Sequence, residues 1–118
     1  MARSKVTPRT ASSTATSLRE ELERWIAAVP GVERQVSRYG HGPSFALGGR
    51  ELVHFHGESR MDVRLTREEI RQRKLDEALD PRLITRGPGS EWVEIRVLCP
   101  EDLAFALSIV EGAVRANQ

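Results

Sequence analysis

Two histidines stand two residues apart in the stretch ELVHFHGESRMDVRL, residues 51–65. His54 and His56 lie in a segment whose apolar residues alternate, and a period of two places both imidazoles on one side of a β-strand. Such a pair could bind a metal ion or act in general acid–base chemistry. Candidates for a third ligand are His41, Asp62 and Glu94. H-x-H alone is a weak motif, so the simpler interpretation is two solvated histidines that hydrogen-bond to nearby acids.

Motifs for covalent catalysis do not occur in this sequence. It has no G-x-S-x-G, and its one cysteine, Cys99, directly precedes Pro100. A thiol near a helix N-terminus can have a lowered pKa, but we expect Cys99 to be buried and inert at a strand-to-helix junction. The segment GPGS at 87–90 lacks the lysine of a P-loop, which predicts a plain loop. The sequence therefore leaves open whether the protein is an enzyme, and it indicates no particular cofactor.

The overall charge indicates no strong attraction to nucleic acid or to a membrane surface. Eighteen Lys and Arg residues stand against seventeen Asp and Glu residues, so no global field would recruit a polyanion. No apolar run approaches the roughly 18 residues that span a bilayer. A single cysteine excludes an intramolecular disulfide and suits a reducing compartment. We expect a cytoplasmic protein.

The first sixteen residues differ in composition from the rest. They are rich in Ser, Thr and Ala, and they contain Arg3, Lys5 and Arg9 but no acid. An organellar transit peptide has a similar composition. We instead predict a disordered tail over residues 1–16, because so polar a segment buries too little apolar surface to become ordered. Residues 17–118 are then expected to form one α+β domain.

The spacing of apolar residues predicts helix, four strands, helix, strand, helix. Ser17 and Glu20 form a capping box for a helix that ends at Pro30-Gly31, and Thr66 and Glu69 form a second box. The expected strands cover residues 32–39, 44–47, 50–56, 60–65 and 91–97. The second helix is expected over 67–79, with an apolar stripe of Ile70, Leu75, Ala78 and Leu79, followed by a loop over 81–90. The last helix starts at Pro100.

This order favours a two-layer α+β sandwich in which helices cover one face of an antiparallel sheet of about five strands. Alternation sorts the strand residues into two sets. The set expected on the helix-covered side is Val53, Phe55, Met61, Val63, Leu65, Val93, Ile95 and Val97. The set expected on the open side is Arg50, Leu52, His54, His56, Asp62, Arg64, Trp92, Glu94 and Arg96. The open side has one large aromatic and several charges, which is typical of a solvated surface or a shallow binding platform.

Three segments together resemble a family of small bacterial and fungal proteins labelled luciferase family or luciferase domain-containing. They are FALGGRELVHFHGESRMDVRLT, GSEWVEIRV and the Pro-Glu-Asp helix start. The resemblance covers residues 17–117 and supplies motif positions but no catalytic residues. The order of elements is also similar to YjbR/MmcQ-like and frataxin-like sandwiches, and in the YjbR-like group a W-V-x-[VI] strand precedes the last helix. Frataxin-like iron binding is not carried over, because acids on the first helix are offset by Arg19 and Arg24.

The leading functional hypothesis is a binding module that uses the open face for a small anionic molecule or a protein partner. Its candidate residues are His54, His56, Asp62, Arg64, Trp92 and Arg96. Arg50, Arg60, Arg64 and Arg96 could form an anion site, or they could only pair with acids. We expect Trp92 to be partly exposed and close to the histidines.

The alternative hypothesis is a small metal-assisted or histidine-dependent enzyme centred on His54 and His56, with Asp62 orienting a ring. Nucleic-acid binding by stacking on Trp92 is a third hypothesis. It is disfavoured by the near-neutral charge and the 5% aromatic content. A homodimer formed through a strand edge or the open face would also account for an exposed tryptophan.

Overall fold

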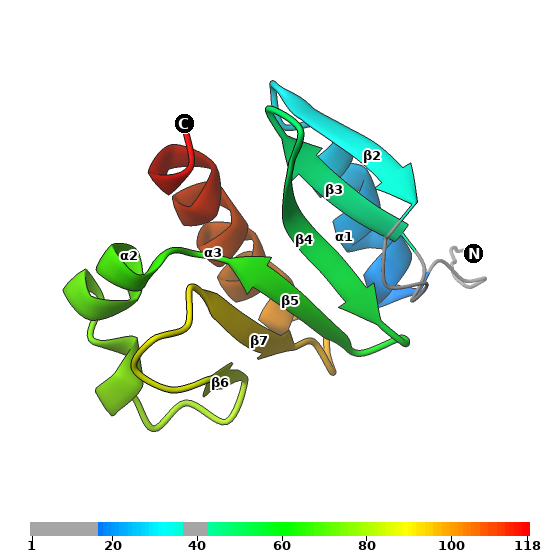
Figure 1. Ribbon diagram of the computed structural model, residues 1–118. Helices are drawn as coiled ribbons and strands as arrows, with labels where there is room; N and C mark the ends of the chain where they lie inside the picture. The colour runs from blue at the N-terminus through cyan, green and yellow to red at the C-terminus, as the bar shows by residue number, and fades with distance from the viewer. Residues whose placement is uncertain (1–16, 37–42) are drawn as a thin grey trace, which may run out of the picture.

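The computed structural model describes residues 17–36 and 43–118, and these form an α+β structure (Figure 1). The elements in chain order are α1 (Leu18–Ala27), β2 (Val32–Val36), β3 (Pro43–Leu47), β4 (Arg50–His56), β5 (Arg60–Arg64), α2 (Arg67–Gln72), the 3-10 turn η1 (Leu75–Glu77), β6 (Leu83–Thr85), β7 (Trp92–Arg96) and α3 (Asp102–Ala116). The expected tail at 1–16, the end of the strand expected over 32–39, and His41 lie outside the described residues.

The strands form one antiparallel sheet in the order β2-β3-β4-β5-β7-β6. In Figure 1 the helices α1 and α3 lie together behind this sheet. The expected fold class, with helices on one face, is therefore confirmed. Among the described helices, none has both the length and the apolarity that a membrane span requires.

The loop expected over residues 81–90 is partly wrong, because Leu83–Thr85 forms a sixth strand at the sheet edge. Leu83 lies opposite Ile95, and Thr85 lies opposite Val93. Three residues between a proline and a glycine-rich turn are too few to show a period. Pairing with a strand formed later in the chain is what makes this segment extended.

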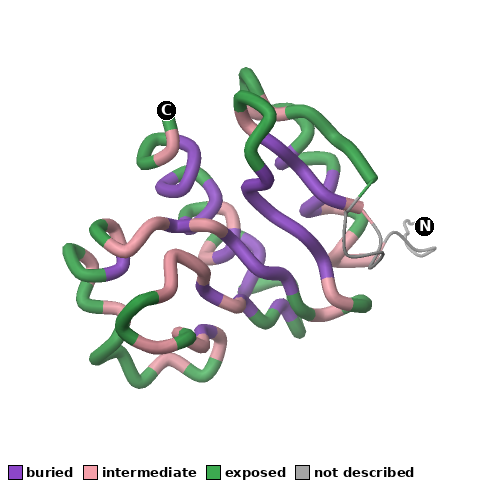
Figure 2. Tube along the Cα trace, in the orientation of Figure 1, coloured by how far each residue is buried: buried purple, intermediate pink, exposed green. Residues whose placement is uncertain are grey.

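The core lies between the sheet and the helices α1 and α3. All eight residues expected on the helix-covered side are buried. They pack with Leu22 and Ile26 of α1 and with Ala106 and Val110 of α3. Figure 2 shows the buried segments running along β4 and β5, so the central strands carry the core.

Local signals account for the start of α1 and for the tightest hairpin. The Ser17 hydroxyl accepts a hydrogen bond from the Glu20 backbone N–H, and the Glu20 carboxylate accepts one from the Ser17 N–H, so the capping box is confirmed. Gly48 and Gly49 join β3 to β4 with φ values of +61° and +80°. A two-residue type I′ turn needs positive φ at both positions, which glycine adopts without strain.

The helix expected over 67–79 is shorter than predicted. It ends at Gln72, and Lys74 then takes a left-handed conformation with φ +57° before a 3-10 turn. Ile70 is buried as expected, but Leu79 is 99% exposed and Ala78 is also exposed. The left-handed residue redirects the chain, so the last two positions of the expected stripe point away from the core. The last helix likewise begins at Asp102 rather than at Pro100.

Candidate functional site on the polar face of the sheet

The sheet face opposite α1 and α3, called the polar face below, has its side chains arranged in rows across the strands. A central row contains Ser44, His54, Asp62, Glu94 and Ile84, which are neighbours in register. A second row, called the basic row, contains His56, Arg60 and Arg96. In a third row Arg64 lies opposite Trp92. The antiparallel register therefore brings all six predicted site residues to one face.

A β-bulge in β4 changes which residues belong to the polar face. Phe45 lies opposite Val53 and Ala46 lies opposite Glu51, which leaves Leu52 as an extra residue. Leu52 is 1% exposed and belongs to the core cluster, so its predicted place on the open side is wrong. The Glu51 carboxylate instead contacts polar-face groups. A bulge interrupts alternation at one position and restores it beyond, which is why His54 and His56 are still placed correctly.

His54, His56 and Asp62 meet at a single carboxylate oxygen. Asp62 Oδ2 lies 3.0 Å from His54 Nε2 and 2.6 Å from His56 Nε2. Both rings are also close to each other, with centroids 4.8 Å apart. His54 and Asp62 are buried, whereas the His56 side chain is 31% exposed. Two imidazoles and a carboxylate in this arrangement could hold a metal ion.

The other oxygen of Asp62 is held by an arginine that sequence reasoning missed. Arg86 Nη2 lies 2.7 Å from Asp62 Oδ1 and 3.1 Å from Glu94 Oε1. Burial would raise the pKa of Asp62, but hydrogen bonds from His54 and His56 and the charge of Arg86 outweigh it and lower that pKa. Asp62 is therefore ionised near neutral pH and can only accept hydrogen bonds.

A second buried carboxylate lies on the other side of His54. Glu51 Oε1 is 3.4 Å from His54 Nδ1. The Ser44 hydroxyl donates to Glu51 Oε2 over 2.5 Å, and Ser44 is completely buried. His54 thus lies between two carboxylates, one facing each ring nitrogen.

Trp92 forms one wall of this centre. Its ring centroid lies 5.2 Å from that of His54, and the Arg64 guanidinium carbon lies 4.7 Å above the Trp92 ring. Arg64 is fixed by the Glu51 carbonyl at 2.9 Å and by the Glu91 carboxylate at 3.1 Å. Trp92 is half-buried and adjacent to a histidine, so the expectation for its position is confirmed.

The basic row lies on the other side of the centre and is more exposed. Arg60 and Arg96 lie directly opposite each other on β5 and β7. Both approach the same oxygen, Glu94 Oε2, at 3.5 Å and 4.0 Å. Arg50 is separate from this group, since its only ion pair among the described residues is with Glu91.

Three residues around the histidines, Arg86, Glu51 and Ser44, were not predicted from the sequence, each for a different reason. Arg86 was missed because strand β6 was missed, although it lies two residues beyond Ile84 and so shares the polar face. Glu51 was missed because strict alternation assigned it to the core side. Ser44 carries no chemical signal in the sequence, and only its register with His54 identifies it.

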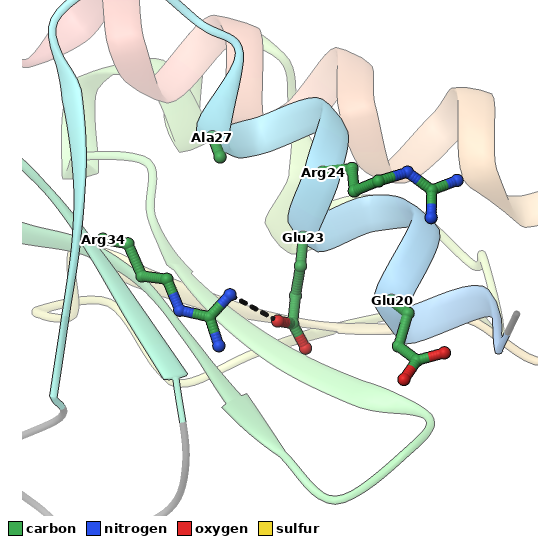
Figure 3. Close-up of a pocket in the computed structure, with 5 residues that line it drawn as sticks. All are labelled: Glu20, Glu23, Arg24, Ala27 and Arg34. Atoms are coloured by element: carbon green, nitrogen blue, oxygen red, sulfur yellow. Dashed lines mark ion pairs between the residues drawn. The ribbon is translucent and has the colours of Figure 1, made fainter.

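Two other features lie away from this centre. Cys99 is exposed, not buried as expected, and hydrogen bonding to Glu101 raises the pKa of its thiol, which disfavours a reactive thiolate. A hollow of about 440 Å³ lies between α1 and β2 (Figure 3). There Arg34 pairs with Glu23 over 3.0 Å. Neither feature shares a residue with the histidine centre.

Comparison with known families gave one match. The model of the Luciferase domain family matches residues 49–113, which include β4, β5, β7 and most of α3. A search of characterised proteins and a search of solved structures each gave no match. The similarity in element order to YjbR/MmcQ-like and frataxin-like sandwiches therefore stays a prediction.

Proposed function

This chain belongs to the Luciferase domain family, and we propose that it works as a binding domain whose polar face takes a small anionic molecule. A family name alone does not assign a reaction, because function resides in the residues of a site. The proposal is supported by the chemistry of the basic row and its surroundings. The centre provides histidine and tryptophan surfaces, and the basic row provides charge.

One observation carries this proposal: three guanidinium groups converge on a single carboxylate, Glu94. Arg60 and Arg96 approach one of its oxygens, and Arg86 approaches the other. Even if Arg86 is assigned entirely to Asp62, two guanidinium groups share one negative charge. Like charges placed directly opposite on neighbouring strands repel. A phosphate or carboxylate group of a ligand would supply the missing charge, and guanidinium groups bind such anions well.

The experiment is a titration of the full chain with inorganic phosphate and with a small dicarboxylate. Trp25 lies on α1 and the chain has two tryptophans, so a Trp25→Phe background leaves Trp92 as the only tryptophan. We expect saturable changes in Trp92 fluorescence and in the amide resonances of β5 and β7. Arg60→Gln or Arg96→Gln should weaken binding about tenfold, the effect of losing roughly 1.4 kcal/mol.

Arg71→Gln is the matched control. Arg71 is exposed on α2, away from the polar face. Its replacement by glutamine removes the same positive charge as the substitutions of Arg60 and Arg96. Its affinity should equal that of the parent protein. Equal weakening by all three substitutions would show that only net charge matters, and unsaturable titrations would reject the proposal. The polar face could instead be covered by a second copy of the chain. Sedimentation at several protein concentrations would detect such a dimer, and Trp92 fluorescence would then depend on protein concentration.

A second candidate function is histidine-dependent acid–base chemistry, favoured by the 2.6 Å contact between His56 and Asp62. An ionised carboxylate that accepts from one ring nitrogen fixes the tautomer and orientation of an imidazole, and the other nitrogen can then exchange a proton with a substrate. Ring-nitrogen NMR should show the Nε2–H tautomer for His56. A dominant Nδ1–H tautomer would contradict this role.

A further inference from the structure

We propose that His54, His56 and Asp62 bind a divalent transition-metal ion of the zinc, nickel or cobalt class. The inference deepens the proposed function and rests on the same face, because a metal ion beside the basic row would be a further anchor for an anionic ligand. Four features of the centre support it: its spacing, the two carboxylates that face His54, the contacts that hold its ligands, and its charge.

The spacing of the three ligand atoms suits a small metal ion. Zinc bonds of about 2.0–2.2 Å at tetrahedral angles separate neighbouring ligand atoms by roughly 3.3 Å. Asp62 Oδ2 is 3.0 Å and 2.6 Å from the two histidine Nε2 atoms, and the set of ligand atoms lies within 4.8 Å. To admit the ion, the 2.6 Å pair would have to open by about 0.7 Å and the 3.0 Å pair by about 0.3 Å, and the widest separation, at most 4.8 Å, would have to close toward the same value. No change of strand register is needed.

The surroundings of the two His54 ring nitrogens give the second argument. Nε2 lies 3.0 Å from Asp62 Oδ2, and Nδ1 lies 3.4 Å from Glu51 Oε1. With a metal ion on Nε2, the N–H group at Nδ1 would face the Glu51 carboxylate. A carboxylate behind a metal-bound histidine is the usual arrangement in metalloproteins.

The groups around the ligands are placed to hold them. Ser44 donates to Glu51, which faces His54, and Arg86 holds the Asp62 oxygen that does not face the histidines. Ligating carboxylates and imidazoles generally require such contacts to keep their orientation. In this assignment Ser44, Glu51 and Arg86 are positioning residues, and only three side chains touch the ion.

Charge in the centre also favours a cation. Glu51 and Asp62 are both buried, and the only arginine that reaches either carboxylate among the described residues is Arg86. Buried carboxylates are costly unless they are paired or coordinate a metal. A donor set of two imidazoles and one carboxylate suits zinc, nickel, cobalt or ferrous iron, whereas magnesium and calcium prefer oxygen ligands. Three protein ligands also leave positions open for water or an anion.

The test is a titration of the EDTA-treated full chain with Zn²⁺ by calorimetry and with Co²⁺ by visible absorption. We expect one ion per chain and the absorption of a nitrogen- and oxygen-ligated cobalt ion. His56→Gln and Asp62→Asn should each lower the affinity at least about 100-fold, since each removes one of three ligands. Histidine ring resonances of both His54 and His56 should shift on binding of diamagnetic Zn²⁺.

Controls separate metal binding from loss of structure. His56 is partly exposed and Asp62→Asn keeps the shape of the side chain, so near-UV circular dichroism should show both variants folded. Asp76→Asn removes an exposed carboxylate that pairs with Arg67, and its affinity should stay within about twofold of the parent, as expected for a distant site. Binding that survives His56→Gln and Asp62→Asn unchanged would overturn the inference, as would a stoichiometry that does not saturate.

A positioning role for Glu51 has its own readout. Glu51→Gln should weaken Zn²⁺ binding about tenfold, within the range known for such contacts, and should change the ¹⁵N shift of His54 Nδ1 in the zinc-bound protein. An unchanged shift would reject that role.

The two proposals, the anion site and the metal site, can fail separately. Phosphate binding by metal-free protein that does not bind Zn²⁺ would reject only the metal site. Zn²⁺ binding with no phosphate response would reject only the anion site.

Discussion

Asp102 illustrates how one carboxylate can fix the junction between the last strand and the last helix. Its Oδ2 accepts hydrogen bonds from the backbone N–H groups of Leu98 and Cys99, at 2.9 Å and 3.3 Å. These bonds hold the turn that leads from β7 into α3. The hydrogen bond from the Leu98 N–H is the main cause that lowers the pKa of Asp102. The carboxylate is therefore more stable ionised in the folded chain than in the unfolded chain.

We predict that Asp102→Ala lowers the free energy of unfolding by about 1–2 kcal/mol at pH 7, the usual effect of leaving such donors unpaired. A lowered folded pKa means that the contribution is fully present above the unfolded value, about pH 4, and is lost as the pH falls through the folded value. The difference from the parent should thus shrink below about pH 4. Urea denaturation at several pH values measures it. A deficit that stays constant with pH would contradict the role of the charge.

At the scale of elements, the bulge in β4 decides which side chains form the candidate site. It moves Leu52 into the core and brings the Glu51 carboxylate to His54. The hairpin before it and the strand after it follow simple rules, but the bulge breaks the alternation between them. The bulge therefore buries Leu52, which its sequence pattern placed on the open side. Leu79 shows the opposite outcome for a different reason: the left-handed Lys74 redirects the chain and leaves Leu79 exposed.

Leu52→Ala should therefore lower the free energy of unfolding by about 2–4 kcal/mol, because it removes a buried side chain and leaves a cavity. Leu79→Ala is the matched control and should change it by less than about 0.5 kcal/mol, as surface substitutions do. Chemical denaturation of both variants gives the comparison. A small loss for Leu52→Ala would show that the bulge is placed wrongly, and a large loss for Leu79→Ala would contradict the exposure of that side chain.

At the scale of the whole molecule, stability should decrease from the centre of the sheet toward its edges. The strands β4, β5 and β7 are covered by the core, whereas β2 and β6 are edge strands. Four of the five residues of β2 are exposed. Segments with few buried contacts open without global unfolding. The edges are also the places where a second chain could pair.

Native-state hydrogen exchange tests this gradient. The hydrogen-bonded amides of β5 and β7 should exchange only by global unfolding, and those of β2 and β6 should exchange by local opening with lower free energy. Zn²⁺ at saturating concentration should slow exchange in β4 and β5, where the proposed ligands lie, more than in β2. Uniform protection across all six strands would contradict the gradient.

Much of the architecture can be predicted from local features of the sequence. The capping box at Ser17, the Gly48-Gly49 turn and the period-two pattern of three strands predicted the fold class and the position of His54, His56, Asp62, Arg64, Trp92 and Arg96 on one face. These features depend on neighbours in the chain, so they can be inferred without the tertiary structure.

The tertiary structure alone decided which further side chains surround His54, His56 and Asp62. A three-residue strand becomes extended only by pairing with β7, and that pairing delivers Arg86 to Asp62. The bulge depends on how β4 fits β3, and it delivers Glu51 to His54. Period and propensity act over a few residues, whereas pairing across strands joins positions as far apart in the chain as Arg60 and Arg96. The histidine pair and Asp62 were therefore visible in the sequence, whereas Glu51 and Arg86, which complete their surroundings, were placed there by strand pairing.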